Sequence, residues 1–280
     1  MIKMALPNKG QLFDPTIELL KACGYKARKS RKSLSCIDTA NNTEFYFLRP
    51  SDIPMYLGEG IIDCGITGMD FCADINSPAE KILDLHYGHS RLCAAIPNDS
   101  AIKELDELKD KRIATSFGGI TRRFFKQDAM KIIPLEGAVE ISVNLGVADA
   151  VVDVVETGST LKQSGLRIIG EPLFHSNAAL LARPGRAETI EVQRLKKRIQ
   201  GYLVALKYMM VEYDAPKEIL DQACLLTPGI ESPTISTLQD KNWFAVKAMI
   251  QKKEANYIMD ELADLGCKGI FLTRIESARI

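Results

Sequence analysis

Short apolar runs alternate with amphipathic stretches along the first two thirds of the chain. Apolar runs of strand length occupy residues 2–6, 44–48, 61–67 and 92–96. Between the first two runs, Phe13, Ile17 and Leu20 recur at helical spacing. Strands that alternate with helices predict an α/β fold with largely parallel sheets.

Local turn and cap signals set the expected boundaries of these elements. Asp14 followed by Pro15 predicts the start of the first helix, and Asn41-Asn42 predicts a turn between strands 35–38 and 44–48. The pattern further predicts helices over 53–57, 101–108 and 121–131, strands over 112–116, 139–143, 166–169 and 178–182, and at 148–155 a strand or a helix followed by a strand. Ligands of such folds bind at the carboxyl ends of strands, here the loops after Leu6, Thr67, Ser116 and Val155.

The last third of the chain has a different pattern. A long helix is expected from about 189 to 213, with a buried face at positions 199, 203, 206 and 210 and with Asp214-Ala215-Pro216 at its end. A strand over 243–250, a helix from Ala255 to Leu265 closed by Gly266, and a strand over 268–273 follow. This βαβ arrangement predicts a small ferredoxin-like regulatory module.

The composition narrows the class of protein. In 280 residues, 36 Lys and Arg balance 36 Asp and Glu, so the basic excess typical of nucleic-acid-binding proteins is missing. No apolar run approaches the ~18 residues of a membrane span, and the N-terminus lacks the apolar region of a secretory signal. We therefore expect a cytoplasmic protein that binds neither nucleic acid nor membrane.

Cysteine and histidine give little support for a metal centre. The seven cysteines contain no C-x-x-C pair, which indicates reduced thiols that mostly fill the core. His86 and His89, with Asp84 and Cys93 nearby, invite a metal interpretation, but their spacing matches no common site. A polar loop is the preferred interpretation of this stretch.

Residues 151–161 carry the strongest chemical signal. The apolar strand Val151-Val152-Asp153-Val154-Val155 runs into the turn Glu156-Thr157-Gly158-Ser159-Thr160-Leu161. The N–H groups and hydroxyls of such a turn suit a phosphate, and its glycine permits close approach. Asp153 and Glu156 can accept hydrogen bonds from ribose hydroxyls, so the segment predicts a phosphoribosyl site. The alternative is an ordinary strand end followed by a helix N-cap.

Other loops place charged groups at the predicted edge. Together they supply Lys9, Gly10, Arg49 and Asp70 and, further along, Phe117 and Arg122. Basic, hydroxyl and acidic groups in one rim fit a polyphosphate with Mg²⁺. Phe117 fits two roles, a stacking surface for a base or a packing residue.

Segments spread along the whole chain match one known family. They are residues 6–10, 49–54, 63–70, 115–125, 135–140, 145–161 with Gly165-Leu166, Tyr213-Asp214, 227–234 and 258–262. On these motifs the chain resembles the ATP phosphoribosyltransferase family in its long form. Two positions depart from the family pattern: Gln11 replaces a frequent arginine, and Phe117-Gly118-Gly119 replaces a turn that usually contains tyrosine.

The resemblance implies a fold and a reaction. It implies two lobes similar to periplasmic binding proteins, formed by residues 1–90 plus 175–205 and by 91–174, and an ACT-like, ferredoxin-like regulatory domain at 206–280. The implied reaction joins adenine N1 of ATP to C1 of phosphoribosyl pyrophosphate and releases pyrophosphate. This is the first step of histidine biosynthesis.

The resemblance also implies residue roles. Asp153, Glu156 and Glu140 are the expected catalytic residues, with Glu140 as acceptor of the N6 proton. The loop of Glu156, Thr157, Gly158, Ser159, Thr160 and Leu161 is expected to hold the 5-phosphate. Nucleotide binding is expected of Lys9, Gly10, Arg49, Asp70, Phe117 and Arg122. Mg²⁺ is expected to be held mainly by substrate oxygens.

Feedback inhibition by histidine is implied as well. Asp214 and Thr234 match family positions that contact the effector, and Ile230 and Gly269 match positions that line its site. Asp214 has an alternative structural role as a residue at the end of a helix. A dimer or hexamer is implied by the resemblance alone.

Other functions fit parts of the sequence. A solute-binding protein would share the two lobes, but the acidic, hydroxyl-rich loop at 156–160 and the missing secretory signal count against it. A sensor that uses the C-terminal module would need a DNA-reading helix, and no basic helix is predicted. A phosphoribosyltransferase with a different acceptor is the third alternative, and only substrate testing separates it.

Overall fold

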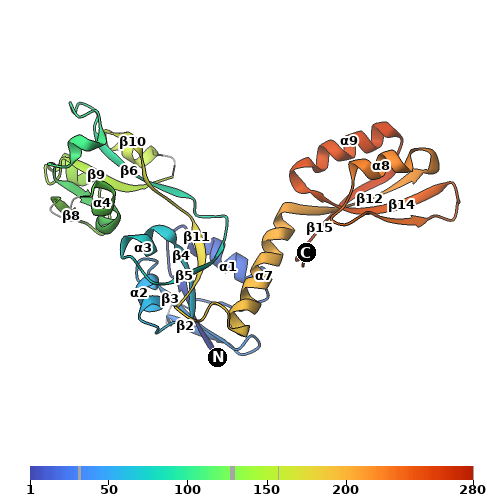
Figure 1. Cartoon of the computed structure of the whole chain (residues 1–280), viewed down its shortest axis with the longest axis horizontal. Coiled ribbons are helices and arrows are strands. Elements are labelled where there is room, and N and C mark those ends of the chain that lie inside the picture. Colours follow the sequence, from blue (N-terminus) through green and yellow to red (C-terminus); the bar gives the residue numbers. More distant parts are fainter. Residues whose placement is uncertain (31–32, 127–129, 157, 280) are drawn as a thin grey trace. The chain divides into compact units, whose positions relative to one another are not determined.

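The computed structural model describes residues 1–30, 33–126, 130–156 and 158–279 (Figure 1). The chain divides into two compact units, Met1–Lys196 and Lys197–Ile280, and the division falls inside helix α7 (Ile190–Lys207). The first unit contains two sheets, which we call the first and second lobe together with their helices. The second unit contains one sheet.

The sheet of the first lobe has six strands in the order β2-β3-β1-β4-β11-β5. β1 (Ile2–Pro7), β3 (Thr43–Leu48) and β4 (Cys64–Gly68) run parallel to one another. β2 (Ser35–Asp38), β5 (Glu80–Asp84) and β11 (Ala178–Ala182) pair antiparallel with their neighbours, and the helices are α1 (Phe13–Ala22), α2 (Ile53–Gly58) and α3 (Met69–Asp74). The carboxyl ends of β1, β3 and β4 therefore share one edge.

The sheet of the second lobe has five strands in the order β10-β6-β9-β7-β8. β7 (Ile113–Thr115), β8 (Ile132–Pro134) and β9 (Ala150–Val155) run parallel, and β6 (Ser90–Pro97) and β10 (Leu166–Ser176) complete the sheet. Its helical segments are η1 (Leu105–Leu108), α4 (Gly118–Phe125), α5 (Ile141–Asn144) and α6 (Ser159–Gln163). The chain passes between the lobes twice, from β5 to β6 and from β10 to β11.

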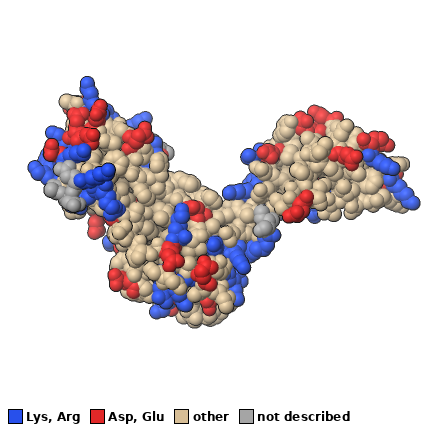
Figure 2. Space-filling model, in the orientation of Figure 1, with Lys and Arg blue, Asp and Glu red and all other residues tan. Residues whose placement is uncertain are grey.

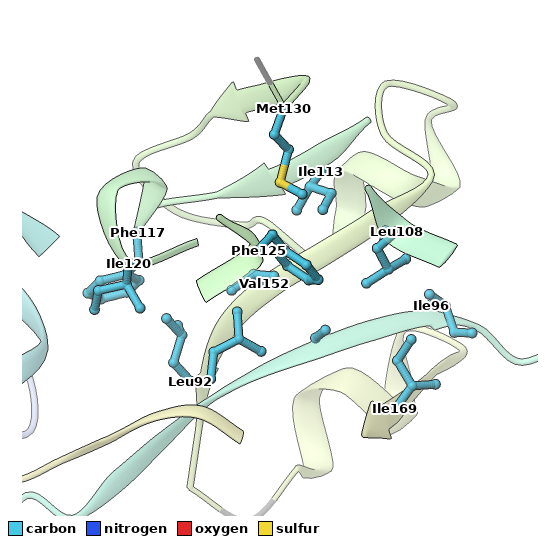
Figure 3. Packing of buried hydrophobic residues seen from close by; sticks show 13 residues of the cluster. Leu92, Ile96, Leu108, Ile113, Phe117, Ile120, Phe125, Met130, Val152 and Ile169 are labelled. Carbon is cyan, nitrogen blue, oxygen red and sulfur yellow. The ribbon is translucent and has the colours of Figure 1, made fainter. Parts of the chain in front are cut away.

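Apolar residues cover both faces of the second-lobe sheet. On one face Leu92, Ile96 and Val152 pack with Phe117, Ile120 and Phe125 from α4 and its preceding loop (Figure 3). On the other face Cys93, Val151 and Val155 pack with Val139 and Leu161. Successive side chains of a strand point to opposite faces, so strands buried on both sides read as the continuous apolar runs of the sequence.

The second unit is a sheet with two helices on one face. β12 (Tyr208–Pro216), β13 (Thr234–Thr237), β14 (Trp243–Gln251) and β15 (Lys268–Arg274) pair antiparallel in the order β13-β14-β12-β15. η2 (Lys217–Ile219), α8 (Leu220–Leu226), η3 (Lys252–Glu254) and α9 (Ala255–Leu265) connect them. Val211, Tyr213 and Ala215 pack under α8 and α9, which leaves the opposite sheet face without helices (Figure 1).

The predicted fold class is confirmed, and the chain of β12, α8, β13, β14, α9 and β15 is a complete ferredoxin-like unit. The long helix predicted over 189–213 was wrong at its end, because α7 stops at Lys207 and the next nine residues form β12. Val211, Tyr213 and Ala215 alternate with more exposed residues, which is the two-residue period of a strand. β12 is also paired on both sides, by β14 and β15.

Several other boundaries differ from the predictions. Asp14 is not the N-cap but lies in the first turn of α1, where its charge suits the helix dipole. The strand predicted over 139–143 is instead helix α5, whose buried side faces the second-lobe sheet. The helices predicted over 101–108 and 121–131 shrink to η1 and to α4, which ends where Lys126 adopts φ +52°. The first residues of the strand predicted over 61–67 belong to a turn after Gly60, so β4 starts at Cys64.

The cysteines and the charges match the expectations from composition. All seven cysteines are free thiols, and Cys23, Cys64, Cys72, Cys93 and Cys267 are buried. Burial raises the pKa of Cys64 and of Cys72 to about 12, so these thiols stay protonated. Both signs of charge are interspersed on the visible face of each unit (Figure 2). Among the described residues, no helix is long and apolar enough to cross a bilayer.

Candidate active site

A cavity of about 650 Å³ opens between the two lobes of the first unit. We call it the interlobe cavity. On the first lobe it is lined by loops that follow β1, β3 and β4, and on the second lobe by loops that follow β7 and β8. Both lobes thus present the carboxyl ends of parallel strands, which is where α/β folds bind ligands.

The first lobe brings four of the predicted nucleotide-binding residues to the cavity. Lys9, Gly10, Arg49 and Asp70 all line it. Gly10 adopts φ +78°, a conformation that glycine provides without strain. The Thr67 hydroxyl donates to the carbonyl of Pro50 at 2.7 Å, which ties the end of β4 to the loop after β3. Charges far apart in sequence are therefore held by hydrogen bonds in one wall.

Asp70 is the buried acid of the cavity. Its carboxylate Oδ1 accepts from the Phe71 N–H at 2.9 Å, and its own N–H donates to Ser176 Oγ at 3.0 Å. Burial raises the pKa of Asp70 above its usual range, although these hydrogen bonds act in the opposite direction.

Phe117 lies at the boundary between cavity and core. Its side chain is 4% exposed, and its ring packs on that of Phe71 with a centroid distance of 5.5 Å. Its N–H donates to Thr115 Oγ1 at 2.9 Å. The structure thus favours packing over stacking on a base. Arg122 does not line the cavity; it lies half-buried on α4.

The sequence analysis missed several cavity residues. They are Asp74, Ser90, Ser176 and Glu136. Glu136 reaches across from the second lobe to Arg49 at 3.7 Å, an exposed ion pair that contributes little stability. Ser90 and Ser176 lie where the chain passes between lobes, and no local sequence signal marks that position.

The predicted phosphate loop lies beside the cavity rather than in its wall. Gly158 is the N-cap of α6 with φ +78°, Ser159 and Thr160 are exposed, and buried Leu161 anchors the helix. Thr157 lies outside the described residues. The N–H groups that begin a helix have no partner within that helix, and helix starts commonly bind phosphate for this reason. None of the described loop residues, Gly158 to Leu161, lines the interlobe cavity.

The acid that precedes the loop, Asp153, faces away from the cavity. Val154 lines the interlobe cavity, so its strand neighbour Asp153 points to the opposite face of β9. There burial raises the pKa of Asp153, and the charge of Glu140 acts in the same direction. The Val154 N–H donates to Asp153 Oδ1 at 2.8 Å. Glu156 is exposed and lines a second pocket of about 580 Å³.

The residues present fit Mg²⁺ only together with substrate. Within the described ranges, no three His, Cys, Asp or Glu side chains are grouped as metal ligands. Mg²⁺ is commonly bound by one or two carboxylates plus substrate phosphates, and Asp70 can supply such a carboxylate. His86 and His89 lie in a loop, as predicted, and line the second pocket with His175, whereas Cys93 is buried in β6.

The candidate histidine-binding residues lie on the open face of the second unit. Asp214 lies within β12, not at a helix end, and its Oδ2 is 3.4 Å from the point that a Cβ on Gly269 would occupy. Thr234 pairs with Lys247, which pairs with Glu212, so Thr234 and Asp214 share this face but lie two strands apart. Ile230 is exposed in the loop before β13.

Comparison with known proteins identifies similar chains over the full length. The ATP phosphoribosyltransferase family model matches residues 49–201, and the model of its C-terminal domain matches residues 205–277. The ATP phosphoribosyltransferase of Arthrobacter sp. (strain FB24) is 45% identical, and that of Salinibacter ruber is 43% identical, each with 100% of both chains covered.

Solved structures show the same two-lobed fold. The ATP phosphoribosyltransferase complex of Thermotoga maritima is 29% identical with a TM-score of 0.61, over 71% of this chain and 99% of that chain. The glutamate-bound GluR0 ligand-binding core of Nostoc punctiforme has a TM-score of 0.50 at 15% identity, over 71% of this chain and 92% of that chain. The second similarity shows the fold alone.

Proposed function

This chain belongs to the ATP phosphoribosyltransferase family in its long form, and on that premise we propose that it transfers the 5-phosphoribosyl group from phosphoribosyl pyrophosphate to N1 of ATP. The products are N1-(5-phosphoribosyl)-ATP and pyrophosphate, and the reaction is the first step of histidine biosynthesis. One observation of the structure carries the proposal. Lys9, Arg49 and Asp70 converge on an interlobe cavity, as two anionic substrates require.

Each part of the site has a chemical task. Lys9 and Arg49 balance the charge of the triphosphate and diphosphate groups, and Asp70 orients one nucleotide. The loop at Glu156 and Thr160 binds the 5-phosphate through its N–H groups and hydroxyls. Arg122 lies on α4 outside the wall of the cavity and is a further candidate for phosphate charge.

The bond-forming step needs charge stabilisation more than base catalysis. Adenine N1 attacks C1 with its own lone pair, so no side chain has to deprotonate it first. Breaking the C1–O bond builds positive charge on the ribose, and we assign its stabilisation to the exposed carboxylate of Glu156. Asp153 points to the face of β9 away from the interlobe cavity, so it acts on the ribose only through its charge at a distance. The N6 amino group then loses a proton, and Glu140 is our candidate acceptor. Positioning and electrostatics therefore dominate.

A bound Mg²⁺ would supply charge stabilisation at the leaving diphosphate. Asp70 is the described cavity acid best placed to hold it together with substrate oxygens. The side chains and backbone N–H groups of the protein bind the two substrates and keep their phosphates apart.

The phosphate loop gives the decisive test of this proposal. Glu156→Gln and Thr160→Ala should each lower kcat roughly tenfold to a hundredfold, because each removes a group that acts on the ribose 5-phosphate. Product formation is measured from the ultraviolet absorbance of the N1 adduct. Ser164→Ala, at the far end of α6, is the matched control and should keep wild-type kinetics. Unchanged kinetics in both test variants would refute our placement of the loop.

Two competing functions are separated by simpler assays. A solute-binding protein would bind one substrate and release no pyrophosphate when both are mixed. A phosphoribosyltransferase with another acceptor would consume phosphoribosyl pyrophosphate with a different base and leave ATP unchanged. The family membership favours ATP as the acceptor.

We further propose that the second unit binds histidine as a feedback inhibitor through Asp214, Thr234, Ile230 and Gly269. An acidic side chain beside a backbone without a Cβ, as at Asp214 and Gly269, suits the ammonium or imidazole of an amino acid. The family resemblance also supports a cytoplasmic enzyme that assembles as a dimer or hexamer. Gel filtration with light scattering tests the assembly.

A further inference from the structure

Helices α3 and α4, one from each lobe, meet at the rim of the interlobe cavity. Asp74, the last residue of α3, accepts at Oδ1 from the Ile120 N–H of α4 at 2.9 Å. Arg123 of α4 donates to the carbonyl of Asp74 at 3.3 Å and also to the carbonyl of Ala73. The contact is thus reciprocal.

The chemistry of helix ends explains why these groups pair. The first N–H groups and the last carbonyls of a helix have no partner within the helix. The start of a helix favours a negative group and its end favours a positive one, because of the helix dipole. Asp74 supplies the negative group for α4, and Arg123 supplies the positive group for α3. Each helix end is therefore completed by the other lobe.

The close approach of the two helices requires a glycine. A Cβ on Gly119 would lie 1.9 Å from the carbonyl oxygen of Asp74, a distance that backbone atoms cannot accommodate without moving. At the preceding Gly118 the nearest atom to such a Cβ is the flexible end of Arg122, at 3.3 Å. The requirement for glycine is therefore specific to the point where α3 crosses α4.

Apolar packing supports the same contact. Phe71 and Ala73 of α3 pack against the hydrophobic core of the second lobe, and the Phe71 ring lies on that of Phe117. Phe117 and Ile120 lie together at the border of this core (Figure 3). A first-lobe helix thus completes the core of the second lobe.

We infer that Asp74 and Arg123 are positioning residues of a lobe latch, formed with Gly119 and the pair Phe71 and Phe117, that holds the interlobe cavity closed. Asp70 lies on the helix that the latch fixes, four residues before Asp74. The latch therefore sets the distance between the nucleotide-binding wall of the first lobe and the second lobe. Its kinetic consequence rests on the proposed transferase function; its structural part does not.

Loss of the latch should weaken substrate binding more than turnover. If the closed arrangement becomes a minor state, apparent affinity falls in proportion to its population, whereas saturating substrate restores closure. For Asp74→Ala and Arg123→Ala in the full chain, we expect KM for both substrates to rise about tenfold and kcat to change less than about threefold. Asp74→Asn keeps an acceptor for the Ile120 N–H and should show a smaller rise. Lys103→Ala removes an exposed second-lobe charge and is the control.

Hydrogen exchange at the Ile120 amide tests the latch without reference to activity. Asp74→Ala should accelerate this exchange about tenfold or more, because it removes the carboxylate oxygen that accepts from that N–H. Arg123→Ala should accelerate it as well, although Arg123 is not the hydrogen-bond partner of the Ile120 N–H, because the two halves of the latch act together. Asp74→Asn keeps the comparison valid if the alanine variant folds poorly.

Three results would overturn the latch. They are an Ile120 amide that exchanges rapidly in the wild-type protein, exchange that is insensitive to Arg123→Ala, and a fall in kcat at unchanged KM. If the Ile120 amide is protected but no N1 adduct forms even with the wild-type protein, the proposed function fails and the latch stands.

Discussion

Asp70 is buried and also lies in the cavity wall. Its burial lowers the stability of the folded protein, whereas its position suits the binding of a ligand. Its pKa is raised by burial, so the folded state binds its proton more tightly than the unfolded chain does. The resulting loss of folding stability is absent at pH values below the pKa that Asp70 has in the unfolded chain. It is fully present at pH values above the pKa that Asp70 has in the folded protein. A buried acid of this kind in a cavity wall is a candidate for a role in binding.

The substitution Asp70→Asn separates these effects. It should raise the melting temperature near pH 7, since asparagine keeps the oxygen that accepts from Phe71 and carries no charge to bury. The gain should shrink toward pH 4. At the same time kcat/KM should fall about tenfold or more. Thermal unfolding at several pH values and steady-state kinetics check both parts, and a melting temperature below that of the wild type at pH 7 would contradict the first.

At the scale of elements, a charged pair joins the starts of two parallel strands of the second lobe, and the loops of the site follow the other ends of these strands. Arg112, just before β7, donates to Asp149, just before β9, through its N–H at 2.9 Å and through Nη2 at 2.8 Å. Side-chain and backbone hydrogen bonds from Arg112 lower the pKa of Asp149 to about 2. This pair lies at the opposite edge of the sheet from the phosphate loop.

Asp149→Asn should therefore destabilise the protein without altering its site. The carboxylate contributes stability above its unfolded pKa, and the contribution is lost as pH falls through about 2. Because both side chains are partly exposed, we expect a loss of at most about 1 kcal/mol near pH 7. The urea midpoint at pH 7, 5 and 3 measures it, with Asp106→Asn, from an exposed pair with Lys109, as control. A difference that grows toward pH 3 would have the wrong sign.

At the scale of the whole molecule, two units divide the work. The first unit holds the interlobe cavity, and the second holds a ferredoxin-like sheet with one open face. The core of the second unit is closed by a hydrogen bond between Tyr213 and Thr227 at 2.7 Å, on the side away from Asp214. If the proposed sites are right, a mutation in the second unit should change inhibition without changing the uninhibited rate.

Asp214→Ala should relieve inhibition by histidine and leave the uninhibited rate unchanged. Loss of a charged hydrogen-bond partner should raise the histidine concentration for half-inhibition about tenfold. Asp221→Ala, which removes an exposed acid from α8 in the same unit, is the control. Inhibition curves with saturating substrates measure the effect. Equal sensitivity to histidine in wild type and Asp214→Ala would reject this site.

Part of this picture was determined by the sequence alone. The short apolar runs predicted most strands of both lobes, because a strand buried on two faces is a local pattern. They missed β5 and β8, and the run at 139–143 leads into helix α5 instead of forming a strand. Glycines and charges after β1, β3 and β4 predicted the cavity wall, because parallel strands bring their carboxyl ends to one edge. The end of α7 was predicted wrongly, since 208–216 is a strand only through its two pairing neighbours.

Only the tertiary structure decided which residues of the two lobes face each other. Three features depend on contacts between segments far apart in the chain. Glu136 reaches Arg49, and Asp74 completes the start of α4. Asp153 points away from the cavity, whereas its neighbour Val154 lines it. No local pattern specifies such contacts, because each partner taken alone reads as a surface charge or a helix end. Only the packing of the two lobes determines what each of these groups meets.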